Sequence, residues 1–355
     1  MQEVMTHSIK VTKIVQSKAS EVDFHNIVMG TRFSDHMFIC DFQNGEWQNP
    51  RIEPLALIPT HPAAMALHYG QAIFEGMKAT LGKDGTPLLF RPDENAKRMN
   101  FSANRMGMPL FPEDLFVEAL KQFVKIEKEW IPTQEGSALY LRPFMYADEA
   151  FIGMRAATSF KFIVMASPTG PFFHKKIKLY VERKYVRAVN GGTGEAKAAG
   201  NYAAAIRPTE HAKTKGYDQV LWLDAQHFEY IQEVGTMNIF FKIGGKFITP
   251  DLSGSILAGI TRMSVIDVLR DKGYEVTERP ITLSEIIEAS NNGTLEEAFG
   301  AGTAVGIARI EEIGNNDLTI KFPVENPISD MVADILEGIK TQDIEDKFGW
   351  IVEAK

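Results

Sequence analysis

The order of apolar and polar positions divides the first half of the chain into short strands and amphipathic helices. The apolar run Met37–Phe42 predicts a strand, which ends at the turn Asn44-Gly45-Glu46. Apolar residues at helical spacing predict helices over Asp93–Met106 and Glu113–Trp130. In the second helix, one face carries Leu115, Phe116, Ala119, Leu120, Phe123 and Ile126. Two nearly continuous apolar runs predict buried strands, namely Leu139–Tyr146 and Phe160–Ala166.

A linker is expected at Ser167-Pro168-Thr169-Gly170-Pro171, because two prolines and a glycine cannot continue the preceding strand. The strands predicted beyond it are Ile177–Val181, Gln219–Leu223, Tyr230–Glu233, Asn238–Ile243 and Lys246–Ile248. The helices predicted there are Asn201–Lys215, Ile260–Lys272, Leu283–Asn291 and Ser329–Lys340. Pro208 lies inside the first of these helices and is expected to kink it or to mark a boundary.

The interleaving of strands and helices has no regular βαβ order, so we predict a two-domain α+β fold. The expected division is a smaller domain over residues 1–167, a linker over 168–175 and a larger domain over 176–355. A chain of 355 residues is long enough for two hydrophobic cores.

Composition indicates a soluble globular protein, with 45% hydrophobic and 24% charged residues. The formal net charge of −8 argues against nucleic acid as a partner, since nucleic-acid binding usually needs a basic surface. The N-terminal residues include an early acid and no apolar signal region, and no apolar stretch is long enough for a membrane helix. We therefore expect a cytoplasmic protein without a membrane partner.

The single cysteine, Cys40, cannot form an internal disulfide and lies in an apolar run, which favours a buried structural thiol over a nucleophile. The eight histidines do not cluster at metal-ligand spacing, so no metal site is expected. Motifs of phosphate-binding loops, zinc proteases and serine hydrolases do not occur either.

The segment Gly191–Tyr202 embeds one lysine, Lys197, among glycines and alanines. Small neighbours can pack around a long side chain and leave room for a planar ligand. A lysine amine that is kept neutral attacks carbonyl groups and can form a Schiff base with an aldehyde cofactor. Composition alone favours the alternative, a flexible glycine-rich loop with a solvated lysine.

Three further segments are candidates for binding. Glu233 ends a predicted strand just before Gly235-Thr236, where a carboxylate could keep a pyridine nitrogen protonated. Gly259-Ile260-Thr261 opens a predicted helix, whose free backbone N–H groups attract anions. Phe299–Val305 is a turn of small residues that could present backbone amides to a phosphate or a carboxylate. Taken singly, each has a simpler explanation: an exposed acid at a strand end, an ordinary helix cap and a tight turn.

Together and in this order, these segments resemble the branched-chain amino acid aminotransferases, which are fold-type IV enzymes dependent on pyridoxal phosphate. The resemblance runs from Phe33-Ser34-Asp35-His36-Met37 to the C-terminal helix. Its other specific pieces are Leu67–Ala79, Leu89–Pro92 and Leu139–Pro143. It implies a two-domain architecture like that of D-amino-acid aminotransferase, with residues 176–355 as the domain that binds the cofactor. It also implies at least a homodimer.

The resemblance assigns roles around pyridoxal 5'-phosphate. Lys197 would bind the cofactor covalently and then act as the acid and base of catalysis. Tyr202 would hydrogen-bond the phenolic oxygen of the cofactor, and Glu233 would pair with its pyridine nitrogen. The residues expected around the phosphate are Arg98, Ile260, Thr261 and Thr303, of which Arg98 would supply forked donors.

The resemblance also implies reversible transamination of leucine, isoleucine and valine with 2-oxoglutarate. The substrate carboxylate would bind backbone amides of Thr303 and Ala304, with Tyr69 and Arg142 nearby. The aromatic residues Phe33, Tyr69, Phe74 and Tyr140 would form a dry pocket for the alkyl side chain. Arg142 or Tyr69 could meet the distal carboxylate of glutamate.

The chain departs from the family in two places. Animal members carry a CxxC pair at the positions of Val305 and Ala308, so thiol regulation at that point is excluded. Phe172 stands where many members have a tyrosine, which removes one hydroxyl from the pocket entrance. Two alternatives stay open: a D-amino-acid aminotransferase or aminodeoxychorismate lyase of the same fold, and a protein without cofactor.

Overall fold

The chain divides into two units, Met1–Pro171 with Gly338–Lys355, and Phe172–Glu337. The computed structural model describes residues 8–170 and 176–355. Phe172 and most of the expected linker, residues 171–175, lie outside the described residues. Each unit contains helices and strands around its own sheet, as predicted for an α+β fold.

A nine-stranded, mostly antiparallel sheet forms the centre of the first unit, in the order β1-β3-β2-β8-β7-β5-β6-β18, with β4 paired to β7. The strands in chain order are β1 (Lys10–Val11), β2 (His36–Gln43), β3 (Glu46–Pro54), β4 (Ala72–Phe74), β5 (Met77–Leu81), β6 (Pro87–Phe90), β7 (Ala138–Ala147), β8 (Phe160–Thr169) and β18 (Ile351–Glu353). The helices are α1 (Met65–Tyr69), α2 (Pro92–Arg105) and α3 (Glu113–Ile126).

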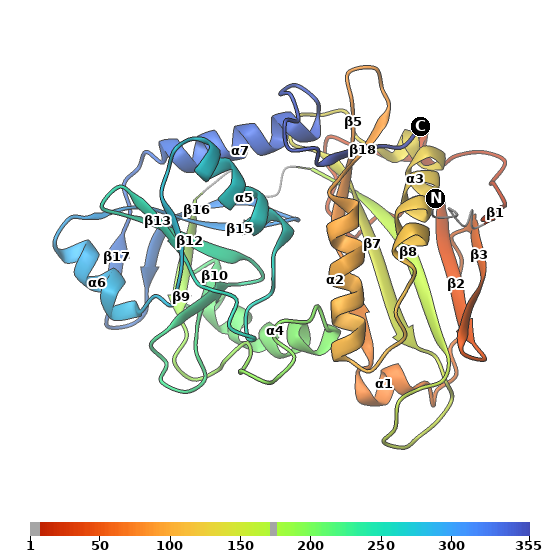
Figure 1. Ribbon diagram of the computed structural model, residues 1–355, viewed down its shortest axis with the longest axis horizontal. Coiled ribbons are helices and arrows are strands. Elements are labelled where there is room, and N and C mark those ends of the chain that lie inside the picture. The colour runs from red at the N-terminus through yellow and green to blue at the C-terminus, as the bar shows by residue number, and fades with distance from the viewer. Residues whose placement is uncertain (1–7, 171–175) are drawn as a thin grey trace, which may run out of the picture. The chain divides into compact units, whose positions relative to one another are not determined.

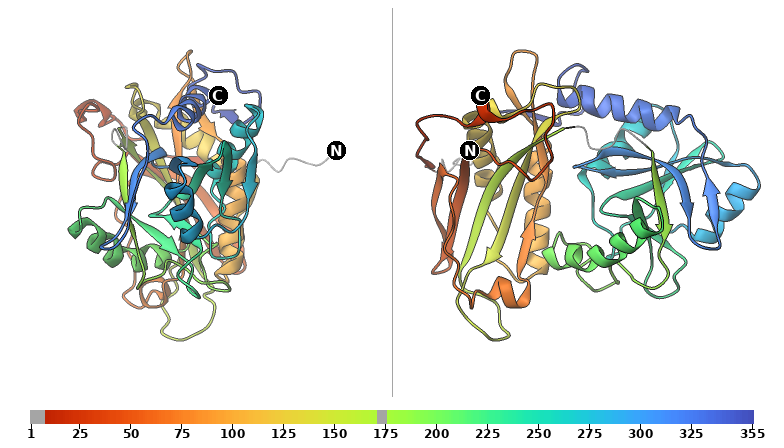
Figure 2. Two further views of the ribbon diagram at one scale, coloured as in Figure 1. Left: turned by 90° about the vertical axis from the view of Figure 1, so that its left-hand side faces the viewer. Right: turned by 180° about the vertical axis from the view of Figure 1, so that it is seen from behind.

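Helices α2 and α3 cover the same face of this sheet (Figures 1 and 2). The predicted apolar face of α3 packs there, where Phe111 stacks on Phe162 of β8 with ring centroids 3.9 Å apart. The sequence predicted one helix to Trp130, but α3 ends at Ile126 and a 3-10 turn follows over Lys128–Trp130. The turn lets the Trp130 indole donate to Asp35 at 2.7 Å.

The predicted second domain was wrong at its C-terminal end. Instead of staying with residues 176–337, Gly338–Lys355 belongs to the first unit. Strand β18 pairs antiparallel with β6, with Val352 opposite Leu89 (Figure 1). Because a strand this short carries no recognisable periodicity, its pairing depends on the exposed edge that β6 offers.

The linker was also expected to begin too early, because β8 continues through Pro168 to Thr169. Pro168 pairs with Leu139 of β7, whereas on its other side β2 pairs only with residues 160–164 of β8. A proline is tolerated at such a strand end because its missing N–H is not needed for a second neighbour.

The second unit is built on another nine-stranded sheet, in the order β11-β10-β9-β16-β15-β12-β13-β14, with β17 paired to β16. Its strands are β9 (Ile177–Val181), β10 (Gln219–Leu223), β11 (Ile231–Val234), β12 (Asn238–Ile243), β13 (Lys246–Thr249), β14 (Val276–Glu278), β15 (Leu295–Gly302), β16 (Gly306–Gly314) and β17 (Thr319–Lys321). The first strand in this order, β11, leads into the sixth, β12, through Gly235–Met237 only. So short a connection brings the two strands together, so the sheet curls on itself.

The helices of this unit are α4 (Ala199–Thr214), α5 (Ile260–Asp271), α6 (Leu283–Asn291) and the first part of α7 (Pro327–Lys340). Pro208 lies inside α4 without ending it. Ala212, beyond the proline, packs with Val220 and Trp222 of β10, and this packing holds the helix across the missing hydrogen bond.

Cys40 is buried in β2, as predicted, and burial raises the pKa of its thiol to about 12. The reactive thiolate is therefore scarce at any pH at which the protein is folded. We expect native protein to be labelled by a thiol reagent only as fast as it unfolds, with no acceleration between pH 7 and 9. Urea-denatured protein is the control and should react at once; fast labelling of the native state would contradict the prediction.

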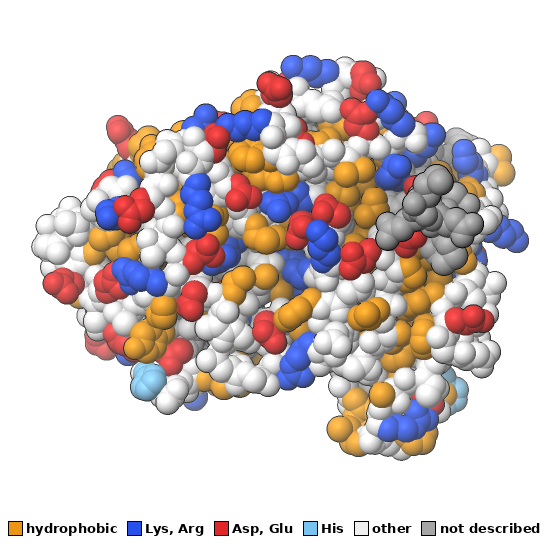
Figure 3. All heavy atoms as spheres, in the orientation of Figure 1, with side chains coloured by type: hydrophobic (Ala, Val, Ile, Leu, Met, Phe, Trp, Pro, Cys, Tyr) orange, Lys and Arg blue, Asp and Glu red, His pale blue; other side chains and the backbone are white. Residues whose placement is uncertain are grey.

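Among the described residues, no helix is both long and apolar enough to cross a bilayer. The described part of the chain also contains no group of three or more His, Cys, Asp or Glu side chains placed to hold a metal ion. On the face seen in Figure 3, basic and acidic side chains are interspersed and form no extended basic area.

Candidate active site

Lys197 lies at the end of a loop of small residues, directly before α4. Its neighbours Ala196 and Ala198 are buried, and its Nζ lies 2.8 Å from the hydroxyl of Tyr202, in the first turn of the helix. The loop therefore presents the amine in a defined place, next to a group that can exchange a proton with it. This arrangement overturns the simpler interpretation of a solvated lysine on a flexible loop.

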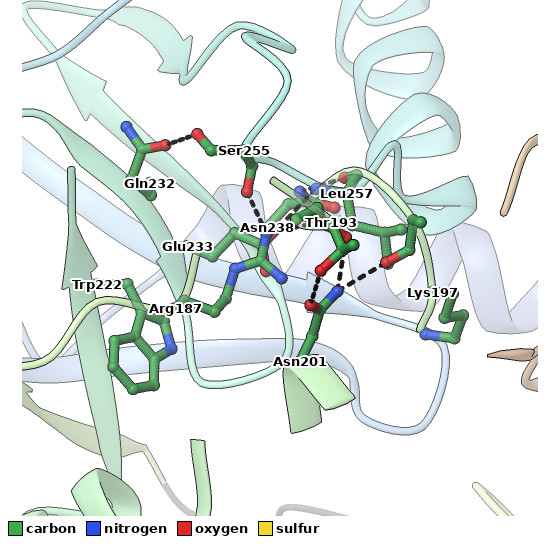
Figure 4. Close-up of polar contacts among 12 residues, drawn as sticks. Arg187, Thr193, Lys197, Asn201, Trp222, Gln232, Glu233, Asn238, Ser255 and Leu257 are labelled. Carbon is green, nitrogen blue, oxygen red and sulfur yellow. Dashed lines mark hydrogen bonds and ion pairs between the residues drawn. The ribbon is translucent and has the colours of Figure 1, made fainter. Parts of the chain in front are cut away.

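Asn201 holds this loop in shape. Its buried side-chain amide donates to the carbonyls of Thr193 at 2.7 Å and Ala196 at 2.9 Å, and its Oδ1 accepts from the Thr193 hydroxyl at 2.7 Å (Figure 4). Three bonds from one side chain fix the backbone that leads into Lys197. Nothing in the sequence pattern distinguished this asparagine from an ordinary helix-start residue.

Glu233 is buried in β11 and is held by two donors. Its Oε1 accepts from the backbone N–H of Leu257 at 2.7 Å and lies 3.0 Å from Nη2 of Arg187, in a buried ion pair. The same Arg187 nitrogen donates to the carbonyl of Gly194 at 3.0 Å and to that of Ser255. Arg187 thus joins Glu233 to the loop of Lys197 and to the segment before α5.

The segment Ser255–Gly259 leads into α5, which begins at Ile260 with Thr261 as its second residue. Both residues are buried, and no side chain caps this end of the helix. Asn238 donates to the carbonyl of Leu257 at 2.9 Å, and a side chain on Gly259 would come within 2.0 Å of its Oδ1. Only glycine therefore allows this approach, and the backbone N–H groups of the first turn stay available for an anion.

Thr303 and Ala304 lie in the loop between β15 and β16, where Gly302 pairs with Gly306. Asn238 pairs with Ala301 on the neighbouring strand, so this loop follows directly from the strand position beside Asn238. In this unit, the predicted residues thus belong to connected segments: Lys197 and Tyr202 to one loop and helix, Glu233 to β11, Ile260 and Thr261 to α5, and Thr303 to the adjoining hairpin.

In the first unit, the structure brings together three of the predicted substrate residues. The Arg142 guanidinium lies over the rings of Phe74 at 4.6 Å and Tyr140 at 5.3 Å, and it donates to the Tyr140 hydroxyl at 3.2 Å. A side chain on Gly76 would collide with that hydroxyl at 2.0 Å, so glycine makes room for the tyrosine. Phe33 and Tyr69 are exposed, and no described contact joins either of them to this group.

Arg98 of α2 forms a bidentate ion pair with Glu75, which is fully buried. Its Nε lies 2.8 Å from Oε1 and its Nη2 lies 2.7 Å from Oε2, where Asn95 also donates at 2.7 Å. The sequence had suggested only a phosphate ligand at this position. The structure adds a second role, because Arg98 neutralises a buried carboxylate.

Two cavities in the second unit lie apart from this lysine. One of about 390 Å³ is lined by Gln232 and Ser255 among others, and one of about 770 Å³ lies between the end of β9 and α4. Neither is lined by Lys197. Gln232 and Glu233 are neighbours on a strand, so their side chains point to opposite faces, and the first cavity is behind the carboxylate.

Two glycines near Lys197 provide a matched test of the loop. A side chain on Gly194 would come within 2.3 Å of Ala188 and 2.6 Å of the Ser255 carbonyl, whereas on Gly200 it would meet nothing within 4 Å. We expect Gly194→Ala to destabilise the protein by about 1–3 kcal/mol through overpacking. Gly200→Ala should be neutral or stabilising by up to about 1 kcal/mol. Urea unfolding measures both; equal stabilities would refute the close packing at Gly194.

Residues 72–313 match the family model of amino-transferase class IV. A branched-chain-amino-acid aminotransferase 2 of Bacillus subtilis is 44% identical over 99% of this chain and 98% of its own. The chain belongs to the branched-chain aminotransferase family. This family membership confirms the resemblance seen in the sequence and the fold-type IV architecture, and it makes the protein an aminotransferase.

Solved structures of this family agree with the fold. A branched-chain amino acid aminotransferase of Escherichia coli has a TM-score of 0.76 and 25% identity, over 90% of this chain and 99% of its own. Another, from T.th. and complexed with N-(5'-phosphopyridoxyl)-L-glutamate, has a TM-score of 0.71 and 25% identity, over 89% and 98%.

For this aminotransferase, sequence reasoning missed the polar residues that support the site. Arg187, Asn201 and Asn238 each bind backbone carbonyls far along the chain, and Glu75 is paired with Arg98. Long-range partners of this kind leave no local pattern, because the contacts arise only after folding.

Proposed function

We propose that the protein transfers amino groups reversibly between leucine, isoleucine or valine and 2-oxoglutarate, with pyridoxal 5'-phosphate as cofactor. The observation that carries the proposal is the contact of Lys197 with Tyr202, in the same unit as a buried Glu233 held by two donors. The 44% identical relative named for branched-chain amino acids supports the substrate class. The phosphopyridoxyl complex of the T.th. enzyme supports the cofactor.

The chemistry of the donors fits pyridoxal phosphate group by group. An amine at Lys197 suits its aldehyde, and the Tyr202 hydroxyl suits its phenolic oxygen. The buried carboxylate of Glu233 suits a protonated pyridine nitrogen. Its phosphate suits the uncapped start of α5 at Ile260 and Thr261, the Thr303 loop and the guanidinium of Arg98. When bound, the cofactor supplies an electron sink for charge that develops at the substrate Cα.

Lys197 is proposed to hold the cofactor and to move the proton at the substrate Cα once its amine is released. Tyr202 orients that amine through the 2.8 Å contact. Asn201 and Gly194 keep the loop from shifting, so the distance over which Lys197 transfers the proton stays short.

The substrate is proposed to meet a mainly aromatic surface with one charge. Backbone amides of Thr303 and Ala304 would bind its α-carboxylate. Phe33, Tyr69, Phe74 and Tyr140 would contact a branched alkyl group, which needs shape and dryness rather than hydrogen bonds. Arg142, stacked on Phe74 and Tyr140, would meet the distal carboxylate of glutamate.

We further propose a homodimer that acts in the cytoplasm. The loop after β7 exposes three large apolar side chains, Phe151 at 36%, Ile152 at 68% and Met154 at 89%, which is typical of a surface that another subunit covers. Light scattering on the purified protein measures its mass; a monomer at micromolar concentration would contradict the dimer.

The visible spectrum of the purified protein, recorded with added L-leucine and then with 2-oxoglutarate, tests the proposal. We expect a yellow protein that bleaches with leucine and regains its colour with the keto acid. A protein that stays colourless after incubation with pyridoxal phosphate would refute the cofactor. A yellow protein that ignores leucine but responds to D-amino acids or aminodeoxychorismate would instead support one of the two related activities.

A further inference from the structure

Arg187 occupies a special place behind the site. Its side chain is only 8% exposed, and one of its nitrogens, Nη2, reaches Glu233, Gly194 and Ser255. These three residues belong to β11, to the loop of Lys197 and to the segment before α5 (Figure 4). One cation therefore connects the three pieces of chain that carry the proposed cofactor ligands.

The partners of Arg187 are themselves held in place. The Ser255 hydroxyl is hydrogen-bonded to Gln232, the neighbour of Glu233, and the 2.7 Å bond from Leu257 fixes the Glu233 carboxylate from the other direction. Gly194 is so close to Ala188 and Ser255 that no side chain fits there. The guanidinium is thus seated in a rigid frame, where it cannot easily be replaced by water.

Removing one member of a buried ion pair is strongly unfavourable, because the other charge is left without compensation. Glu233 is 4% exposed at its side chain, so water does not replace Arg187 as its partner. Without the guanidinium, the carboxylate would either turn away or bind a proton. In both cases it could no longer accept a hydrogen bond from a pyridinium nitrogen.

We propose that Arg187 is a positioning residue, which keeps Glu233 charged and aimed for the pyridine nitrogen of the cofactor. The inference rests on the proposed function, since it needs pyridoxal phosphate as the ligand. Arg187 acts through Glu233 and does not itself touch the cofactor. Its loss should therefore weaken cofactor binding and lower kcat, and leave the KM for leucine nearly unchanged.

A double-mutant cycle between Arg187→Met and Glu233→Gln tests the coupling. The measurements are the dissociation constant of pyridoxal phosphate from apoprotein by equilibrium dialysis, the urea midpoint of the apoprotein, and kcat and KM for leucine. We expect Arg187→Met to weaken cofactor binding by at least about tenfold. In the Glu233→Gln background, the same change should cost less than about threefold, because the charge that Arg187 compensates is gone.

Two further variants serve as controls. Arg183→Met removes an exposed arginine that makes no ion pair among the described residues, and it should behave as wild type. Arg187→Lys keeps the charge on a shorter donor without the fork, so it should recover part of the binding. It also replaces Arg187→Met in the cycle if that variant does not fold.

The outcomes separate the two proposals. Equal penalties for losing Arg187 in both backgrounds would overturn the inference, since they would make Arg187 a general brace. Wild-type binding and kcat in Arg187→Met would overturn it as well. If wild-type apoprotein itself does not bind pyridoxal phosphate, the proposed function fails and the inference fails with it.

Discussion

Replacing Lys197 by methionine is expected to lower the rate of transamination by at least about four orders of magnitude, as for other groups that act covalently. Methionine keeps the length of the side chain but has no amine, so it can neither hold the cofactor nor move the proton at the substrate Cα. A coupled assay with leucine and 2-oxoglutarate measures the loss. Lys213→Met is a matched control, because Lys213 is exposed and pairs only with Glu210 at 2.8 Å.

The same prediction has a chemical counterpart. Borohydride treatment of the yellow protein, followed by peptide mass spectrometry, should find the phosphopyridoxyl group on Lys197 alone. The Lys197→Met protein should carry no label. A label on another lysine, or a variant that keeps more than a hundredth of the wild-type rate, would show that Lys197 is not the catalytic amine.

Arg98→Met is expected to destabilise the first unit by about 3–5 kcal/mol, the usual cost of leaving one member of a buried ion pair alone. The reason is Glu75, which is fully buried and receives two parallel hydrogen bonds from Arg98. Equilibrium urea unfolding of the apoprotein measures the change. An apoprotein as stable as wild type would contradict the structural role of this pair.

A double variant separates this structural role from phosphate binding. With Glu75→Leu added, Arg98→Met no longer leaves a buried charge, and stability should return to within about 1–2 kcal/mol of wild type. If Arg98 also binds the cofactor phosphate, the double variant will still bind pyridoxal phosphate more weakly. Recovery of both properties together would restrict Arg98 to the ion pair.

The position of Lys197 is an example of what a pattern can reveal. Glycines and alanines around a single lysine indicated close packing, and the structure agrees: Ala196 and Ala198 are buried and Gly194 has no room for a side chain. The pattern did not identify Arg187 or Asn201. Their partners lie up to 68 residues away along the chain, as in the bond from Arg187 to Ser255, and no local spacing encodes such a contact.

Strand and helix boundaries show the same division. The apolar face of α3 was visible in the sequence, because periodicity is a local property. The continuation of β8 through Pro168 and of α4 through Pro208 was not, since both depend on neighbours that excuse a missing N–H.

By itself, the sequence determined the α+β class, most of the helices and strands, and the residue types that suit pyridoxal phosphate. These follow from periodicity and from the chemistry of single side chains. Only the tertiary structure decided that β18 completes the first sheet, that Arg98 is paired with Glu75, and that Arg187 ties Glu233 to the loop of Lys197. The physical reason is that buried charges and sheet edges select their partners by proximity, and proximity between distant segments exists only in the folded chain.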